Sequence, residues 1–116
     1  MTIQNWSDNI IVAELVDDPQ FTDEMVSLTD IVKQNCVNVV INLSAVSHMN
    51  SSNLSALLRL RKRVLAGKNR IILCGIDTRV RTVFSITGLD KVFEFADDTA
   101  TALASIQIAA KPDNAD

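Results

Sequence analysis

Short apolar stretches recur along the chain and predict five β-strands. The expected strands cover residues 3–6, 10–16, 37–43, 70–74 and 92–95. The third and fourth of these are rich in β-branched residues and apolar at almost every position, which is typical of central strands covered on both faces. The last alternates between apolar and polar residues, which predicts an edge strand.

Between the strands, apolar residues three or four positions apart predict about four amphipathic helices. Polar residues that can cap a helix precede these segments, and glycines follow two of them. The expected helices run from Thr22 to Gln34 or Asn35, from Asn50 to Gly67, from Asp77 to Gly88, and onward from Asp97-Asp98.

This alternation of strands and helices indicates the fold class. A strand, a helix and a further strand of these lengths form a βαβ unit, which implies parallel pairing and a right-handed crossover. We therefore expect an α/β fold, with one mixed, largely parallel β-sheet packed with about four α-helices. Residues 1–110 are assigned to a single domain and residues 111–116 to a C-terminal tail.

Composition excludes several classes of protein. Apolar residues make up 47% of the 116 positions and charged residues 22%, which is ordinary for a globular protein. The apolar runs are too short to span a bilayer, and the N-terminus does not resemble a secretion signal, so we expect a cytoplasmic protein without direct membrane insertion. Cys36 and Cys74 are expected to be buried free thiols.

Charge is segregated along the chain, although the net value is only −3. Residues 59–91 contain nine basic and two acidic residues, whereas both flanking segments are acidic. Such a separation can orient a charged protein partner, but a solvated helix face would produce the same pattern. Nucleic-acid binding is disfavoured because no aromatic residues interleave with the basic ones.

Candidate chemistry is concentrated where the third strand ends. In a parallel sheet the loop at residues 44–50, the helix start at 50–53 and the turn at 75–78 share the carboxyl edge, where ligands bind. The helix start has two interpretations: Asn50 or Ser51 only caps the helix, which is worth about 1 kcal/mol, or a serine is exposed for phosphorylation. The only histidine, His48, has no partner at ligand spacing, so we expect no enzyme activity, metal or cofactor.

Two separate stretches resemble a known family. Residues 39–54, VVINLSAVSHMNSSNL, look like the signature of the STAS domains of anti-sigma-factor antagonists. In that family a hydrophobic strand leads to Asp-Leu-Ser and then to an Asp-Ser-Ser-Gly-Leu helix start. Residues 80–90, VRTVFSITGLD, are similar to a second family segment, in which a helix ends in Thr-Gly-Leu. The resemblance is good over residues 37–108 and loose over the first 36.

The resemblance implies a binding switch. Such domains bind an anti-sigma factor, often a serine kinase, and displace its sigma factor. The kinase then phosphorylates the first serine of the motif, which ends the interaction until a phosphatase restores it. Carried over to this chain, the acceptor is Ser51. The expected partner-binding residues are His48, Asn50, Ser51, Ser52, Asn53 and Asp77.

The motif departs from the family at three positions. Asn42 and Asn50 stand where the family has aspartates, and Asn53 stands where it has glycine. Asn50 makes the unmodified site less negative, and Asn53 is expected to add bulk that hinders approach by a kinase. Both residues leave a polar cap intact.

These departures leave other functions open. One is a non-phosphorylated STAS scaffold subunit in a signalling assembly or in a membrane transporter complex. Another is a flavodoxin-like domain that binds a nucleotide or phosphate, which the scarcity of aromatic residues disfavours. The sequence leaves the oligomeric state, monomer or dimer, undetermined.

Overall fold

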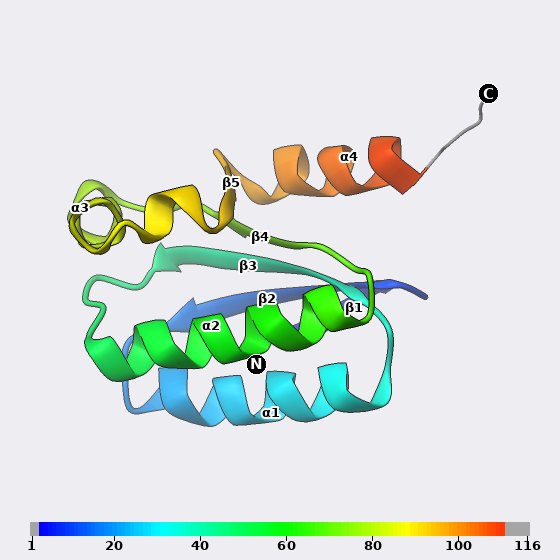
Figure 1. The fold of residues 1–116 in the computed structure, drawn as a ribbon, viewed down its shortest axis with the longest axis horizontal. Coiled ribbons are helices and arrows are strands. Elements are labelled where there is room, and N and C mark those ends of the chain that lie inside the picture. The colour runs from blue at the N-terminus through cyan, green and yellow to red at the C-terminus, as the bar shows by residue number, and fades with distance from the viewer. Residues whose placement is uncertain (1–2, 111–116) are drawn as a thin grey trace.

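The strands form one sheet whose spatial order follows the chain, β1-β2-β3-β4-β5 (Figure 1). The computed structural model describes residues 3–110. β1 pairs with β2 in antiparallel orientation, and all the other neighbouring strands are parallel. The strands are β1 (Ile3–Ser7), β2 (Ile10–Val16), β3 (Asn38–Ala45), β4 (Ile71–Cys74) and β5 (Glu94–Ala96).

Helices cover both faces of this sheet. α1 and α2 lie side by side on one face, α4 lies on the other, and α3 lies beyond one end of the sheet (Figure 1). The helices are α1 (Gln20–Gln34), α2 (Ser51–Ala66), α3 (Thr78–Thr87) and α4 (Thr99–Ala110), with a short 3₁₀ helix, η1 (Leu89–Lys91). The expected α/β class, with a mixed, largely parallel sheet, is confirmed.

β3 explains why the central strands are apolar at nearly every position. Val39 and Ile41 point into the larger core with α1 and α2, whereas Val40 points into a smaller core with α4. All three side chains are fully buried. Alternate residues of a strand face opposite sides of the sheet, so a strand with helices on both sides buries residues of both faces.

The first helix begins earlier than expected. We predicted Thr22 as its N-cap, but the helix starts at Gln20 with Pro19 as the capping residue and no side-chain cap. The carboxylate of Asp18 instead accepts hydrogen bonds from the Thr22 amide and hydroxyl, at 3.0 and 2.6 Å. Pro19 directly precedes the first helical residue, where the missing N–H of proline removes no hydrogen bond of the helix.

The last strand was also misplaced. It covers Glu94–Ala96 and not residues 92–95, because the chain first forms η1 and then turns Phe93 into the core. The ring of Phe93 contacts Phe84 edge-on, with centroids 5.9 Å apart. The predicted position of the last strand at an edge of the sheet is confirmed, because β5 is the last strand in the spatial order.

Only one of the two cysteines is buried. Both thiols are free, but Cys36 is exposed, because it lies in the connection between α1 and β3 and not in the sheet. Cys74 lies in β4, where burial raises the pKa of its thiol. Among residues 3–110, no helix is long and apolar enough to cross a membrane. The expected tail at 111–116 lies outside the described residues.

Candidate functional site

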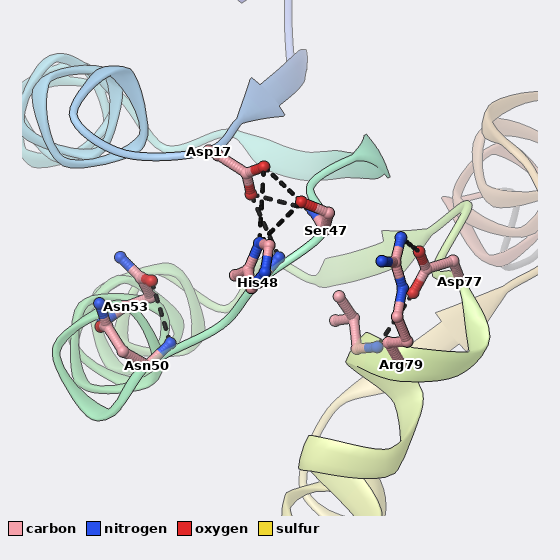
Figure 2. A network of polar contacts seen from close by, with 8 residues as sticks. Asp17, Ser47, His48, Asn50, Asn53, Asp77 and Arg79 are labelled. Atoms are coloured by element: carbon pink, nitrogen blue, oxygen red, sulfur yellow. Dashed lines mark hydrogen bonds and ion pairs between the residues drawn. The ribbon is translucent and has the colours of Figure 1, made fainter.

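The carboxyl ends of the parallel strands bring the predicted site residues together. Figure 2 shows His48 in the loop after β3, Asn50 and Asn53 at the start of α2, and Asp77 at the start of α3. The figure also shows Asp17, from the end of β2, pointing into the same region. The sequence-based grouping of these loops at one edge therefore agrees with the structure.

A reciprocal pair of hydrogen bonds fixes the start of α2. The Asn50 side-chain oxygen accepts from the Asn53 amide at 2.8 Å, and the Asn53 side-chain oxygen accepts from the Asn50 amide at 3.1 Å (Figure 2). This capping box satisfies amide groups that a helix start otherwise leaves unpaired. Asn50 is therefore the cap, and the expected polar cap is confirmed.

Asn53 also connects α2 to the start of α1. Its side-chain amide donates to the carboxylate of Asp18 at 3.0 Å, and only 5% of the residue is exposed. The other oxygen of Asp18 accepts from Thr22 in the first turn of α1. We expected Asn53 to add bulk at the helix start, and the structure shows that this side chain is buried. At this position the asparagine side chain links the starts of the two helices through Asp18.

Asp17 fixes the loop that leads into α2. Its carboxylate accepts from the amides of Ser47 and His48, at 2.9 and 3.2 Å, and from the Ser47 hydroxyl at 2.5 Å. These hydrogen bonds, chiefly those from Ser47, hold the pKa of Asp17 below its usual value. Hydrogen bonds from Thr22 and Asn53 likewise lower the pKa of Asp18. Both carboxylates are thus ionised near neutral pH.

His48 is the most exposed group of this network. Its Nδ1 atom lies 2.8 Å from the Ser47 hydroxyl and 4.0 Å from the Asp17 carboxylate, while 85% of its side chain is exposed. Here the serine contacts both the acid and the histidine, whereas a hydrolytic triad requires the histidine between the other two. The order of the contacts thus differs from that of a serine activated by a histidine and an acid.

Sequence analysis missed the roles of Asp17 and Asp18. We assigned them no role at the site, because their partners Ser47 and Asn53 lie 30 and 35 positions away in the sequence. One signal was available: both acids directly follow a parallel strand, at the same sheet edge as the predicted site.

The start of α3 is built from its own residues. Asp77 caps the helix by accepting from the Val80 amide at 3.0 Å, and its second oxygen pairs with Arg79 at 3.0 Å (Figure 2). The Val80 bond is the main reason that the pKa of Asp77 is lowered. The predicted capping role is confirmed.

The turn before Asp77 needs glycine. Gly75 has a φ of +71°, and a Cβ there would lie 2.7 Å from the side-chain oxygen of Asn42. That oxygen accepts from the Ser44 amide, while the Asn42 amide donates to Thr99 of α4. Asn42 therefore organises the ends of β3 and β4.

Ser51 and Ser52 are both exposed in the first turn of α2. Neither hydroxyl forms a hydrogen bond with the part of the chain that the structure describes, and this turn contains no acidic residue. Ser52 faces α1, whereas Ser51 lies outside the groove between the two helices. Ser51 thus presents a free hydroxyl at the positive end of a helix dipole.

Metal binding finds no support in this region. Within residues 3–110, no group of three or more His, Cys, Asp and Glu side chains could hold a metal ion. The accessible groups are amides, hydroxyls, one imidazole and carboxylates already bonded to backbone.

Comparisons with known proteins agree with this architecture. A similar fold occurs in an anti-sigma-factor antagonist (STAS) domain protein from Planctomyces limnophilus, with a TM-score of 0.80 and 17% sequence identity over 92% of this chain and 99% of that one. The Bacillus cell fate determinant SpoIIAA in its phosphorylated form also has a similar fold, with a TM-score of 0.72 and 20% identity over 90% of this chain and 97% of that one. A structure of the stressosome, a signal integration and transduction hub, also matches, with a TM-score of 0.75 and 18% identity over 94% of this chain and 98% of that one. The family model of the STAS domain matches residues 14–102. The chain therefore belongs to the STAS domain family.

Proposed function

We propose that this protein is a regulatory binding module of the anti-sigma-factor antagonist type, and not an enzyme. It acts in the cytoplasm, binds a kinase-type anti-sigma factor, and is switched by phosphorylation of Ser51. The observation that carries this proposal is the free, exposed Ser51 hydroxyl in the first turn of α2. The similar fold of SpoIIAA, which has been solved in a phosphorylated form, supports it.

The position of Ser51 makes phosphorylation compatible with the fold. A phosphate adds roughly −1.5 to −2 units of charge, and a helix N-terminus stabilises negative charge through its dipole and free amides. Ser51 is the first residue of α2, directly after the Asn50 cap. The modification therefore leaves the helix folded and changes the charge that a partner meets.

The structure divides the expected partner-binding residues into two groups. His48, Asn50, Ser51 and Ser52 are exposed, and we propose that they contact the partner. Asn53 is buried and Asp77 uses both oxygens within α3. We propose that these two position the surface.

A second candidate is a non-phosphorylated scaffold subunit of a signalling assembly or of a transporter complex. It is favoured by Asn50, which replaces the family's acid next to the acceptor, and by the likeness to a stressosome structure. The same exposed surface would then bind its partner permanently.

Intact-mass spectrometry after incubation with ATP and the organism's own kinase-type anti-sigma factors separates the two candidates. We expect a gain of one phosphoryl group in the wild type and in Ser52→Ala, and no gain in Ser51→Ala. No gain in the wild type with any of these kinases would contradict the switch, as would a gain that persists in Ser51→Ala.

A further inference from the structure

A groove of about 370 Å³ runs between α1 and α2 on the outer face of the molecule. The two helices are parallel, so one end of the groove lies at their N-termini and the other at their C-termini (Figure 1). Thr22 and Ser52 line the first end, and Lys33 and Arg63 line the second. The stretch from Ser52 to Arg63 spans roughly 16 Å, about three turns of a helix.

The three cations that line this groove form no ion pair with the described part of the chain. Lys33, Arg59 and Arg63 are exposed, and none forms an ion pair or hydrogen bond with another residue of the described range. Asp30 is the one acid among the lining residues. The groove thus carries a local excess of positive charge in an acidic protein.

Other arginines of the basic stretch are already engaged within the fold. Arg61 lies over the ring of Phe93 and Arg81 over that of Phe95, with guanidinium-to-centroid distances of 6.0 and 5.6 Å. Arg70 pairs with Glu94, and Arg79 pairs with Asp77. The basic residues that remain unengaged are therefore the cations that line the groove and a few surface lysines.

Apolar side chains lie beside these cations. Met25 is buried beneath the groove and Ala56 is half-buried, whereas Val26 is 59% exposed. A single exposed valine is ordinary on a protein surface. In a concave site flanked by three unpaired cations, however, it indicates a ligand with both apolar and acidic groups.

We infer that the groove between α1 and α2 binds an acidic amphipathic segment of a partner protein. Apolar side chains of that segment contact Val26 and Met25, and its carboxylates pair with Lys33, Arg59 and Arg63. This inference goes beyond the proposed switch, because binding in the groove requires neither a kinase nor a phosphate on Ser51.

The test uses the unphosphorylated protein and a synthetic 14-residue peptide with glutamates on one helical face and leucines on the other. We expect amide NMR shifts confined to α1 and α2, including Val26 and Ala56. R59E/R63E should weaken binding at least tenfold. The matched pair K62E/K91E, which makes the same charge change outside the groove, should leave Kd within twofold.

A second pair of variants tests the apolar contact. Val26→Gln should weaken peptide binding several-fold, whereas Ile86→Gln, at a 79% exposed position on α3, should not. All these positions are exposed, so circular dichroism should report unchanged folding. If a variant fails to fold, the amide shifts that the peptide causes in the wild-type protein still test whether it binds between α1 and α2.

Several results would overturn the inference. These are no shifts at millimolar peptide, equal losses in the two charge-reversal pairs, or equal binding of a peptide whose leucines are replaced by glutamine. The same shifts with phosphatidylglycerol vesicles or inorganic phosphate would identify a lipid surface or a simple anion instead. Because no kinase or ATP is present, a failure here is distinct from a failure of the Ser51 proposal.

Discussion

The starts of α2 and α3 face the same sheet edge but are stabilised in different ways. α3 depends on its own first turn, in which Asp77 bonds the Val80 amide and pairs with Arg79. α2 depends on its own cap and also on Asp17 and Asp18, which lie more than 30 positions before it in the chain. The start of α3 is therefore stabilised locally, whereas the start of α2 also depends on tertiary contacts.

This difference has a functional consequence. A partner that contacts the start of α2 meets a surface already fixed by the loop between β2 and α1. Fixing a surface before binding lowers the entropy lost on association. The proposed switch at Ser51 therefore acts on a rigid surface, and the predictions below ask how far that rigidity depends on the remote loop.

The largest effect is expected at Asn53, where the capping box and the link to Asp18 meet. Asn53→Ala should lower the free energy of unfolding by about 1–3 kcal/mol, because it removes buried hydrogen bonds and leaves their partners unsatisfied. Urea denaturation followed by circular dichroism measures this. Ser55→Ala, an exposed change on the same helix, should stay within about 0.5 kcal/mol. Equal losses in the two variants would show that the tertiary link contributes nothing.

A smaller loss is expected at the cap itself. Asn50→Ala should cost about 1 kcal/mol, because the Asn53 amide then loses its side-chain acceptor while the link from Asn53 to Asp18 survives. The same denaturation assay applies. A loss larger than that of Asn53→Ala would reverse the order and make the start of α2 as local as that of α3.

Acid should weaken the hydrogen bonds at the two helix starts in different ways. Asp17, Asp18 and Asp77 have folded-state pKa values below the ordinary 3.8, so the unfolded chain binds more protons as the pH falls. Their stabilisation is complete above about pH 5 and is lost progressively as the pH falls through 3.8 and the folded values. In an NMR titration, protonation of Asp17 should change the chemical shifts of the Ser47 and His48 amides. Protonation of Asp77 should change amide shifts only in α3.

Variants sharpen the pH prediction. Asp17→Asn/Asp18→Asn should reduce the acid dependence of the unfolding free energy and abolish the titration of the Ser47 amide, leaving Val80 unaffected. An unchanged Ser47 titration in this double variant would contradict the assignment of Asp17.

The smallest effect is expected at Arg79. Its pair with Asp77 is exposed, and such pairs contribute little to stability because water screens the charges and holding the two side chains together costs conformational entropy. Arg79→Ala should therefore leave the urea midpoint unchanged. A loss comparable to that of Asn53→Ala would mean that the start of α3 needs more than its aspartate cap.

Local patterns predicted most of the fold. The apolar run of β3 and the Asp77 and Gly88 boundaries of α3 follow from strand burial and capping, which depend on near neighbours. The start of α1 and the exposure of Cys36 were misjudged because they depend on how the connections pack.

The candidate site was predictable only in part. Asn50 as a cap follows from local sequence, but the inward turn of Asn53 depends on Asp18, which no local pattern connects to it. The groove cations likewise required the structure, because sequence alone does not distinguish Arg59 and Arg63 from the arginines engaged with aromatic rings or acids.

The most direct test of the central claim is the affinity for a kinase-type anti-sigma factor, measured by calorimetry without ATP. Ser51→Asp places a negative charge where a helix start tolerates it, so the fold should be retained. We predict that it weakens binding at least tenfold, while Ser51→Ala and the matched control Ser55→Asp bind like the wild type. Equal affinities for the wild type and Ser51→Asp would contradict the account.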